Sequence, residues 1–279
     1  MKFFLSLLFA VYFVFAPLVP QAHAAAPTDY VSCWDFDESS AGAGAVTRFD
    51  ANTTNSNDLT DVNTTASAAG KIGNAIDIER GNSEYLTITD ASQVGLDGLS
   101  AWSYFVWVNF ESTPSSGQNY GLIGKRDTAD GATYAYNSEI NNNAGTMRFR
   151  AELYTGAVEE GALTNWTPST ATWYHIGWTF DGGTKTWKYY VNGAQQGSDI
   201  VFVTNNSIRN TTAALVIGKP NSDPASFFDG LMDVSEYYNR VLSGTEITDI
   251  YNSGTGVACT GRAGGGGATV DTTSFMMFE

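Results

Sequence analysis

The chain has 279 residues, of which 29 are acidic and 14 are basic, so its formal charge at neutral pH is −15. This balance argues against nucleic acids and anionic surfaces as partners, because both repel an acidic protein. The length is compatible with one large domain, since β-sandwiches of roughly 200–250 residues are routinely single domains. No linker interrupts the middle of the chain, and the Gly-rich break at 261–267 sets off only a short tail.

The first 24 residues have the pattern of a secretory signal peptide. Lys2 precedes an apolar run over residues 3–19, and Ala22 and Ala24 supply small residues at the −3 and −1 positions of a cleavage site. Two prolines interrupt the run, whereas a membrane-spanning helix needs roughly 20 apolar residues. We therefore expect a secreted or cell-surface protein whose mature chain begins near Ala25 and is not inserted in a membrane. Loss of the segment shifts the formal charge from −15 to −16.

Cys33 and Cys259 are the two cysteines, and they lie near the two ends of the expected domain, 25–260. In an exported protein an even pair favours a disulfide over two free thiols. A bridge across most of the chain would stabilise the fold by about 4 kcal/mol in the chain-entropy treatment. It would also require the first and last strands to lie side by side.

Strand-like segments follow one another from residue 30 onward, separated by clusters of Gly, Asn, Asp and Ser. Residues 37–69 are polar and are expected to be mostly loop with short strands. Residues 102–110 are apolar on both faces, which is typical of an inner strand. The expected strands are 30–36, 75–78, 84–88, 102–110, 121–125, 133–140, 146–153, 174–180, 184–191, 213–217 and 230–237.

The stretch TWKYYVNG ends in a predicted hairpin. Trp187, Tyr189 and Val191 lie on one face of an extended chain, because strand side chains alternate with a period of two. Asn192 and Gly193 tolerate the positive φ angles that a two-residue hairpin turn requires. We expect the three side chains to face the core and the turn to lead into another strand.

One helix is expected near the end of the domain. Ser243 and Glu246 have the spacing of a capping box, Ile247 and Ile250 follow at helical spacing, and Gly254 marks the stop. Many short strands with a single short helix describe an all-β, two-sheet antiparallel sandwich or jelly roll.

Five segments then carry a family resemblance: VSCWDFDE at 31–38, GKIGNAIDIERGNSEYLTI at 70–88, TWYHIGWTFDGGTKTWKYYVNG at 172–193, IGKP at 217–220 and FFDGLMDVSEYYNRVLSGTEITDIYNSG at 227–254. Together, and in this order, they resemble the laminin-G-like jelly-roll domains of the concanavalin A-like lectin/glucanase superfamily. The resemblance implies two antiparallel sheets of about six to seven strands each, stacked ~10 Å apart. It also implies that the first and last strands are adjacent.

The same superfamily contains glycoside hydrolases, which need two facing carboxyl groups about 5–5.5 Å or about 6.5–9.5 Å apart. Its glucanases carry them in a Glu-x-Asp-x-x-Glu run, and no such run occurs here. Asp77 and Glu79 share a strand face, but Asp77 is expected to be a surface residue. His175, the one histidine after the predicted cleavage site, is expected to be structural. We therefore predict that the chain is not an enzyme, and a glycoside hydrolase remains an alternative.

Structural calcium is the candidate cofactor, because carboxylates and carbonyls supply the hard oxygen ligands that calcium prefers. The resemblance places the family's calcium between the turn after the NAIDIERG strand and the acidic residue of the GLMDV strand. Here these positions are Glu79 and Asp233. Arg80 is inserted relative to the family pattern, so two solvated or hydrogen-bonded acids are an equally good interpretation.

Sugar binding uses exposed aromatic rings with polar neighbours. Trp166 and Tyr120 lie in loop-like sequence and are the candidate ligand-binding residues, with edge packing as the alternative for Trp166. We therefore predict a secreted, non-catalytic module that binds a glycan or a cell-surface protein, as in adhesion. A structural surface or filament subunit is another alternative, because the apolar segment 272–279 could add as a strand to a second copy of the chain.

Overall fold

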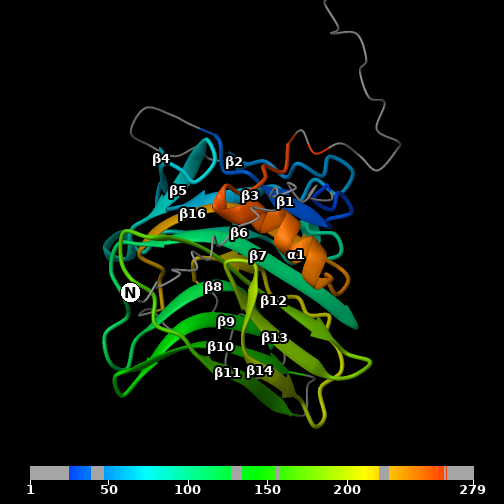
Figure 1. Ribbon diagram of the computed structural model, residues 1–279. Coiled ribbons are helices and arrows are strands. Elements are labelled where there is room, and N and C mark those ends of the chain that lie inside the picture. Colours follow the sequence, from blue (N-terminus) through cyan, green and yellow to red (C-terminus); the bar gives the residue numbers. More distant parts are fainter. Residues whose placement is uncertain are drawn as a thin grey trace, which may run out of the picture.

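The protein is described here by a computed structural model that places residues 25–38, 47–126, 134–154, 158–219, 226–260 and 262. Over these ranges it is a sandwich of two antiparallel sheets, as the sequence predicts (Figure 1). The predicted signal peptide and nearly all of the predicted tail lie outside the described residues. Among the described residues, no helix is long and apolar enough to cross a membrane.

Within the described ranges each sheet has eight strands, and each includes long central strands and shorter outer ones. Sheet A runs in the order β14 (Ala194–Val201), β13 (Thr186–Val191), β12 (Trp173–Asp181), β7 (Ala101–Phe110), β16 (Gly230–Tyr238), β5 (Asn74–Ile78) and β4 (Ala66–Ala69), and β1 (Ser32–Trp34) also pairs with β16. Sheet B runs in the order β11 (Glu159–Asn165), β10 (Thr146–Tyr154), β9 (Tyr134–Asn143), β8 (Asn119–Arg126), β15 (Leu215–Ile217), β6 (Tyr85–Ile88), β3 (Leu59–Val62) and β2 (Thr47–Arg48).

The core lies between the two sheets and is rich in aromatic side chains. Trp102, Trp178 and Trp187 are fully buried there, with Trp102 edge-on to both other indole rings at centroid distances of 5.9 and 5.7 Å. Alternate residues of each strand point into this core because the side-chain period of a strand is two. The residues between them form an outer face on each sheet, and these two outer faces carry the polar clusters described below.

The TWKYYVNG stretch folds as predicted. Trp187 and Tyr189 are buried in the core, and Val191 packs against it. Asn192 and Gly193 have φ angles of 51° and 77°, and Val191 pairs with Ala194 across a two-residue turn. The turn therefore leads directly from β13 into β14.

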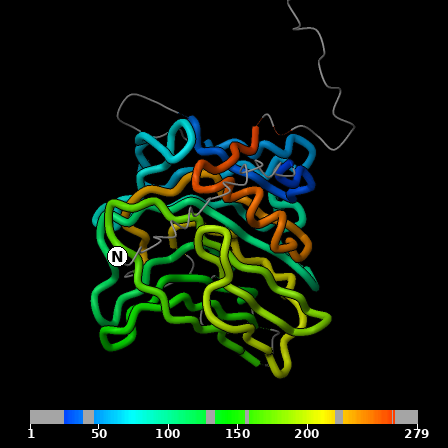
Figure 2. Tube along the Cα trace, in the orientation of Figure 1, coloured from blue at the N-terminus to red at the C-terminus, as the bar shows by residue number. Residues whose placement is uncertain are grey.

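The two ends of the domain meet on sheet A. Strand β1 pairs antiparallel with β16, and Cys33 forms a disulfide with Cys259, 226 residues later in the sequence. Figure 2 shows the first and last described segments lying together on the same side of the molecule. Both the disulfide and the adjacency of the first and last strands are thus confirmed.

The helix α1 (Gly244–Tyr251) covers part of the outer face of sheet A (Figure 1). The predicted capping box is present: the Ser243 hydroxyl accepts from the Glu246 amide at 3.3 Å, and the Glu246 carboxylate accepts from the Ser243 amide at 2.8 Å. Ile247 and Ile250 pack on Phe105 of β7. Three short 3-10 helices complete the described elements: η1 (Arg80–Asn82), η2 (Asp90–Ser92) and η3 (Asn252–Gly254).

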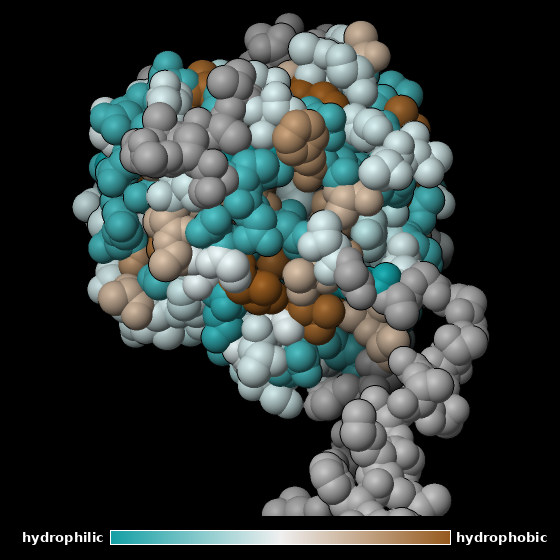
Figure 3. Space-filling view, turned by 90° about the horizontal axis from the view of Figure 1, so that it is seen from above, coloured by the Kyte–Doolittle hydropathy of each residue, from teal (hydrophilic) through white to brown (hydrophobic). Residues whose placement is uncertain are grey.

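Seen from above, the surface is mostly hydrophilic, and its apolar residues form small groups (Figure 3). This agrees with a formal charge of −15 and with the strongly acidic composition.

Candidate functional site

Three neighbouring strands of sheet A bring polar side chains together on its outer face. The register pairs Asp77 of β5 with Leu231 of β16, and Leu231 in turn with Asn109 of β7. The flanking residues of each strand lie against the core or in its interior, so these three side chains point away from it. The residues that follow β5 and β7, Glu79 and Glu111, extend the same face.

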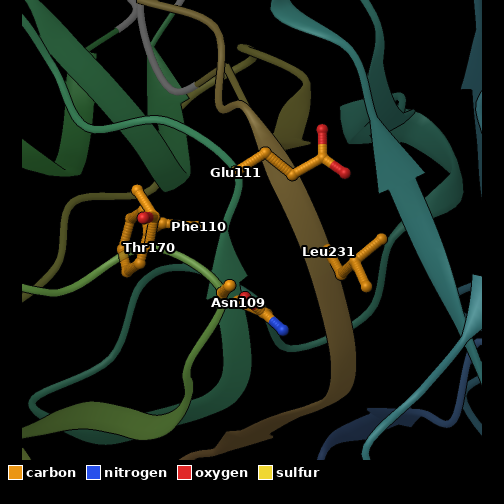
Figure 4. A pocket seen from close by; sticks show the side chains of 6 residues that line it. Asn109, Phe110, Glu111, Thr170 and Leu231 are labelled. Atoms are coloured by element: carbon orange, nitrogen blue, oxygen red, sulfur yellow. The ribbon is translucent and has the colours of Figure 1, made fainter.

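Asp77, Glu79 and Glu111 form a compact group that we call the acidic cluster. One carboxylate oxygen of each residue lies within 4.8 Å of the others. Figure 4 shows the Glu111 side chain pointing away from Phe110 and Thr170, toward the side of β16 on which Leu231 lies. Three carboxylates from two strands thus converge at one end of sheet A.

The electrostatics of the acidic cluster are unfavourable without a cation. Burial, and then repulsion by Glu79, Glu84 and Asp229, raise the pKa of Asp77. Burial and the charges of Asp77, Glu79 and Asp229 likewise raise the pKa of Glu111. In addition, the Oδ1 atom of Asp77 is buried and has no hydrogen-bond partner. The cluster therefore offers hard oxygen atoms that no described donor satisfies.

Two further acids near the cluster already have partners that fix the surrounding loops. The Glu84 carboxylate accepts from the Glu79 amide at 2.8 Å, and Asp229 accepts from the Arg80 amide at 3.2 Å. Asp229 also accepts from the Ser112 hydroxyl. These bonds hold the turn after β5 and the segment before β16, so they position the acidic cluster.

A pocket of about 360 Å³ adjoins the acidic cluster. It shares Glu111 with the cluster and combines polar groups with apolar surface (Figure 4). Its lining consists of Asn109, Phe110, Glu111, Thr170, Ala171 and Leu231. An amide, a carboxylate and a hydroxyl beside apolar side chains form the kind of lining that binds small polar ligands.

The structure does not bring the two predicted calcium ligands together. Glu79 belongs to the acidic cluster, whereas Asp233 lies deeper along β16, opposite Trp107. Because Ile78 pairs with Gly230 in antiparallel register, Glu79 and Asp233 are displaced by four residues, which is roughly 13 Å along the sheet.

Asp233 has a structural setting of its own. It is fully buried, and its Oδ2 atom accepts from the Ile72 amide at 2.8 Å, which holds the segment between β4 and β5 against β16. Burial raises the pKa of Asp233 to about 7. The Oδ1 atom is buried without a hydrogen-bond partner.

The two aromatic rings predicted to bind a ligand serve in packing. Tyr120 lies in β8, is 2% exposed and shares a 2.5 Å hydrogen bond with Ser112. Trp166 directly follows β11, remains partly exposed, and stacks on Phe149 with a centroid distance of 4.6 Å. Neither ring lines the pocket beside the acidic cluster. A binding role for them stays a prediction, and Trp166 is the more accessible of the two.

His175 is buried in an aromatic environment. Its ring lies 5.4 Å from Phe105 and 5.0 Å from Trp107, and neither ring nitrogen has a hydrogen-bond partner. Burial lowers the pKa of His175 to about 3, so the ring is neutral at ordinary pH. This packing agrees with the structural role expected for His175.

Sequence reasoning missed Asn109 and Glu111 and read Asp77 as a surface residue, whereas Asp77 is partly buried. The available signal was that Asp77 and Glu79 share a strand face. Glu111 lies on a different strand, so the convergence depends on the register of β5, β16 and β7. The residues of a single strand do not predict this register.

Comparison with family profiles identifies the family to which the chain belongs. Residues 80–248 match the family profile described as the concanavalin A-like lectin/glucanases superfamily, in its laminin-G group. The chain belongs to this family, as the five sequence segments indicated. No curated protein matches the sequence.

Solved structures with low sequence identity share the fold. Domain 4 of an extracellular GH43 arabinanase from Geobacillus stearothermophilus, in complex with arabinotriose, has a TM-score of 0.57 and 18% identity, over 81% of this chain and 98% of that one. The binding domain of Paraclostridial Mosquitocidal Protein 1 has a TM-score of 0.59 and 14% identity, over 81% and 52%. Trypanosoma rangeli sialidase in complex with sialic acid has a TM-score of 0.58 and 18% identity, over 85% and 35%.

The chain therefore spans nearly all of the arabinanase domain, about half of the toxin domain and about a third of the sialidase. At these identities the likeness concerns the fold, and one fold supports many functions. The function has to be argued from the site.

Proposed function

We propose that the chain is a secreted, non-catalytic module that binds carbohydrate through the pocket beside the acidic cluster. The carrying observation is that Glu111, one of the three converging carboxylates, also lines this pocket. Asn109 and Thr170 can exchange hydrogen bonds with sugar hydroxyls, and Leu231 offers an apolar surface to the C–H face of a ring. An adhesion protein that displays such a site would bind glycans on another surface.

We further propose calcium as the cation of the acidic cluster. The donor set fits, because calcium prefers several carboxylate and carbonyl oxygens and tolerates irregular geometry. The unpartnered Oδ1 of Asp77 and the mutual repulsion of the carboxylates support a cation at this place. Bound calcium would supply the positive charge that the cluster lacks, and Glu111 would then be oriented at the edge of the pocket.

Structural likeness gives this proposal limited support. The arabinanase domain was solved with arabinotriose, and other matched structures are a toxin binding domain and a sialidase. These are properties of those proteins. For this chain they favour a carbohydrate ligand over other classes, and the residues of the pocket are what the proposal rests on.

A glycan array tests the proposal. Residues 25–279 would be applied with calcium and again with a chelator, and light scattering of the same sample would report its size. We expect selective binding by a monomer, weakened by the chelator and by Asn109→Ala. Absence of any glycan signal would contradict the proposal, and large defined assemblies without glycan binding would favour the structural-subunit alternative.

A further inference from the structure

One lysine of sheet B points into the sandwich and away from solvent. Lys125, near the end of β8, is fully buried, and the register places it opposite Tyr136 of β9 and Leu215 of β15, which both belong to the core. Side chains in register on neighbouring strands share a face, so Lys125 points inward with them. A buried ammonium group is costly to desolvate, so its surroundings call for a chemical explanation.

The Nζ atom of Lys125 lies among two carboxylates and one backbone carbonyl. It is 2.7 Å from the Oδ2 atom of Asp97, it donates to the Thr211 carbonyl at 2.7 Å, and it also donates to Asp90. The side chain of Asp97 is 5% exposed, whereas that of Asp90 is 29% exposed. Asp97 is therefore enclosed together with the lysine, and Asp90 lies on the side of the group that is open to solvent.

The carboxyl group of Asp97 is held by two donors of its own. The Thr211 amide donates to its Oδ2 atom at 3.1 Å, and the Nε2 atom of Gln93 donates to its Oδ1 atom at 3.4 Å. The same Nε2 atom donates to Asp90 at 3.3 Å, and the side-chain carbonyl of Gln93 accepts from the Leu96 amide at 2.9 Å, which orients the side chain. Donors fixed in this way stabilise the negative charge that develops on a carboxyl oxygen during nucleophilic attack.

A primary amine in contact with a carboxyl group has the components of an amide bond. Holding the two groups together replaces their encounter in solution, and well-oriented intramolecular reactions reach effective concentrations of roughly 10⁵–10⁸ M. The lysine amine is a nucleophile in its neutral form, and a carboxylate within hydrogen-bond reach can take its proton. The hydrogen bond from Lys125 lowers the pKa of Asp90, so this carboxylate is ionised beside the ammonium group.

We propose that Lys125 and Asp97 form an intramolecular isopeptide bond. Asp90 accepts a proton from the ammonium group, and the neutral Nζ atom attacks the Cγ atom of Asp97. The Nζ–Cγ bond forms, one C–O bond of the Asp97 carboxyl breaks, and the two protons that the nitrogen loses leave on that oxygen as water, relayed by Asp90. The step is not a redox reaction and needs no co-reactant, because an ammonium and a carboxylate contain the same atoms and net charge as an amide and one water molecule.

The bond converts a buried ion pair into a neutral amide. This removes two charges from the interior, where each is costly to desolvate. The new amide keeps the existing partners, because its N–H can donate to the Thr211 carbonyl and its oxygen can accept from the Thr211 amide. The crosslink ties β8 to the segment that passes from β6 of sheet B to β7 of sheet A. It is a second covalent link, apart from the disulfide, and it does not depend on the proposed carbohydrate function.

Peptide mapping of the purified protein tests the proposal. Trypsin and a glutamate-specific protease together would release 85–111, which contains Asp97, and 112–125, which ends at Lys125. We expect the first peptide to remain joined to 112–126 instead, because trypsin does not cleave after a modified lysine. The joined mass should be one water molecule below the sum of the two peptides, and fragment ions should place the bond between Asp97 and Lys125.

Variants identify the residues that take part. Asp97→Asn should form the same bond with loss of ammonia instead of water, and so give joined peptides of the same mass as wild type. Asp97→Ala should release the two peptides separately. Asp90→Ala should slow the joining roughly a hundredfold, as loss of a general base does, and leave separate peptides in freshly purified protein.

The matched control is Lys188→Met, since Lys188 lies 3.2 Å from Asp199 in an ion pair on the surface. It should leave the joined peptides unchanged, and thermal melts would establish that each variant is folded. Separate peptides of ordinary mass from folded wild type would overturn the proposal. Joined peptides whose fragment ions place the bond at Asp90 would overturn the assignment to Asp97.

Discussion

The outer faces of the two sheets hold their charges in opposite ways. On sheet A, Asp77, Glu79 and Glu111 converge with the same sign, and a buried oxygen of Asp77 lacks a partner. On sheet B, Arg150 bridges Glu139 and Glu152, so the charges of these two carboxylates are compensated from within the protein. The comparison teaches that like charges can converge on one face with no cation from the described residues among them, whereas on the other face an arginine pairs with the buried carboxylates. Each of the following changes should affect one face and spare the other.

The largest effect is expected from the disulfide, which secures the layer that covers part of sheet A. Cys33 and Cys259 close a loop with a sequence separation of 226 residues, and they pack against Trp107 on the outer face. The double variant Cys33→Ser and Cys259→Ser should lose about 4–5 kcal/mol of unfolding free energy in the chain-entropy treatment. Urea unfolding of the wild type and the double variant would measure this loss. An unchanged unfolding midpoint would show that packing alone holds the covering layer.

Removal of Arg150 should have the next largest effect, because it leaves Glu139 and Glu152 buried without their cation. We expect Arg150→Met to cost about 3 kcal/mol of unfolding free energy, the lower end of the range for broken buried pairs, because Arg150 is partly exposed. The control is Arg148→Met, since Arg148 lies on the same strand and donates to the neutral amide oxygen of Asn141 at 2.9 Å. Equal losses of unfolding free energy in the two variants would mean that the pairs of Arg150 with Glu139 and Glu152 contribute no more than an ordinary surface contact.

Calcium should act on sheet A in the opposite direction, by adding a cation. At about tenfold excess over Kd it should stabilise the fold by roughly 1.4 kcal/mol, or roughly 3–6 °C in Tm for a chain of this size. Glu111→Gln should abolish this gain and raise Tm in the presence of a chelator, because it relieves repulsion. Asp199→Asn is the control on an exposed carboxylate. A calcium-induced rise that persists in Glu111→Gln would place the ion elsewhere.

The smallest effect concerns Asp233, a fully buried acid on β16 of sheet A. Its folded pKa is raised to about 7 from 3.8, so the folded state holds the proton more strongly than the unfolded state. The resulting stability is present at low pH and is lost as the pH rises through about 7. We expect the unfolding free energy to fall by about 1 kcal/mol between pH 6 and 7. Asp233→Asn should flatten this dependence, and a parallel curve for the variant would refute the assignment.

The sequence predicted most of the sandwich because its inner strands carry strong patterns. Strand β7, apolar on both faces, was expected within one residue of its observed bounds, and the capping box of α1 was identified from Ser243 and Glu246. Strands β11 and β14 were not delimited. They form the outer edges of the two sheets and expose most of their side chains, so no apolar alternation marks them.

The candidate sites were harder to predict because they depend on pairing between strands. Asp233 seemed a partner for Glu79, but the antiparallel register of β5 and β16 separates them and brings Glu111 in instead. Tyr120 seemed to lie in a loop, but it is the second residue of β8 and is buried in the core. The sequence shows the type of each residue, whereas the register between strands determines which residues become its neighbours.

The most direct measurement is a crystal structure of residues 25–279 grown with calcium and the strongest glycan from the array. The anomalous scattering of calcium would identify the ion independently of the residues that hold it. We expect the ion at Asp77, Glu79 and Glu111, with a sugar ring in the adjoining pocket against Asn109 and Leu231. An ion held by other residues, or a sheet A pocket left empty while the glycan binds elsewhere, would contradict the proposed function.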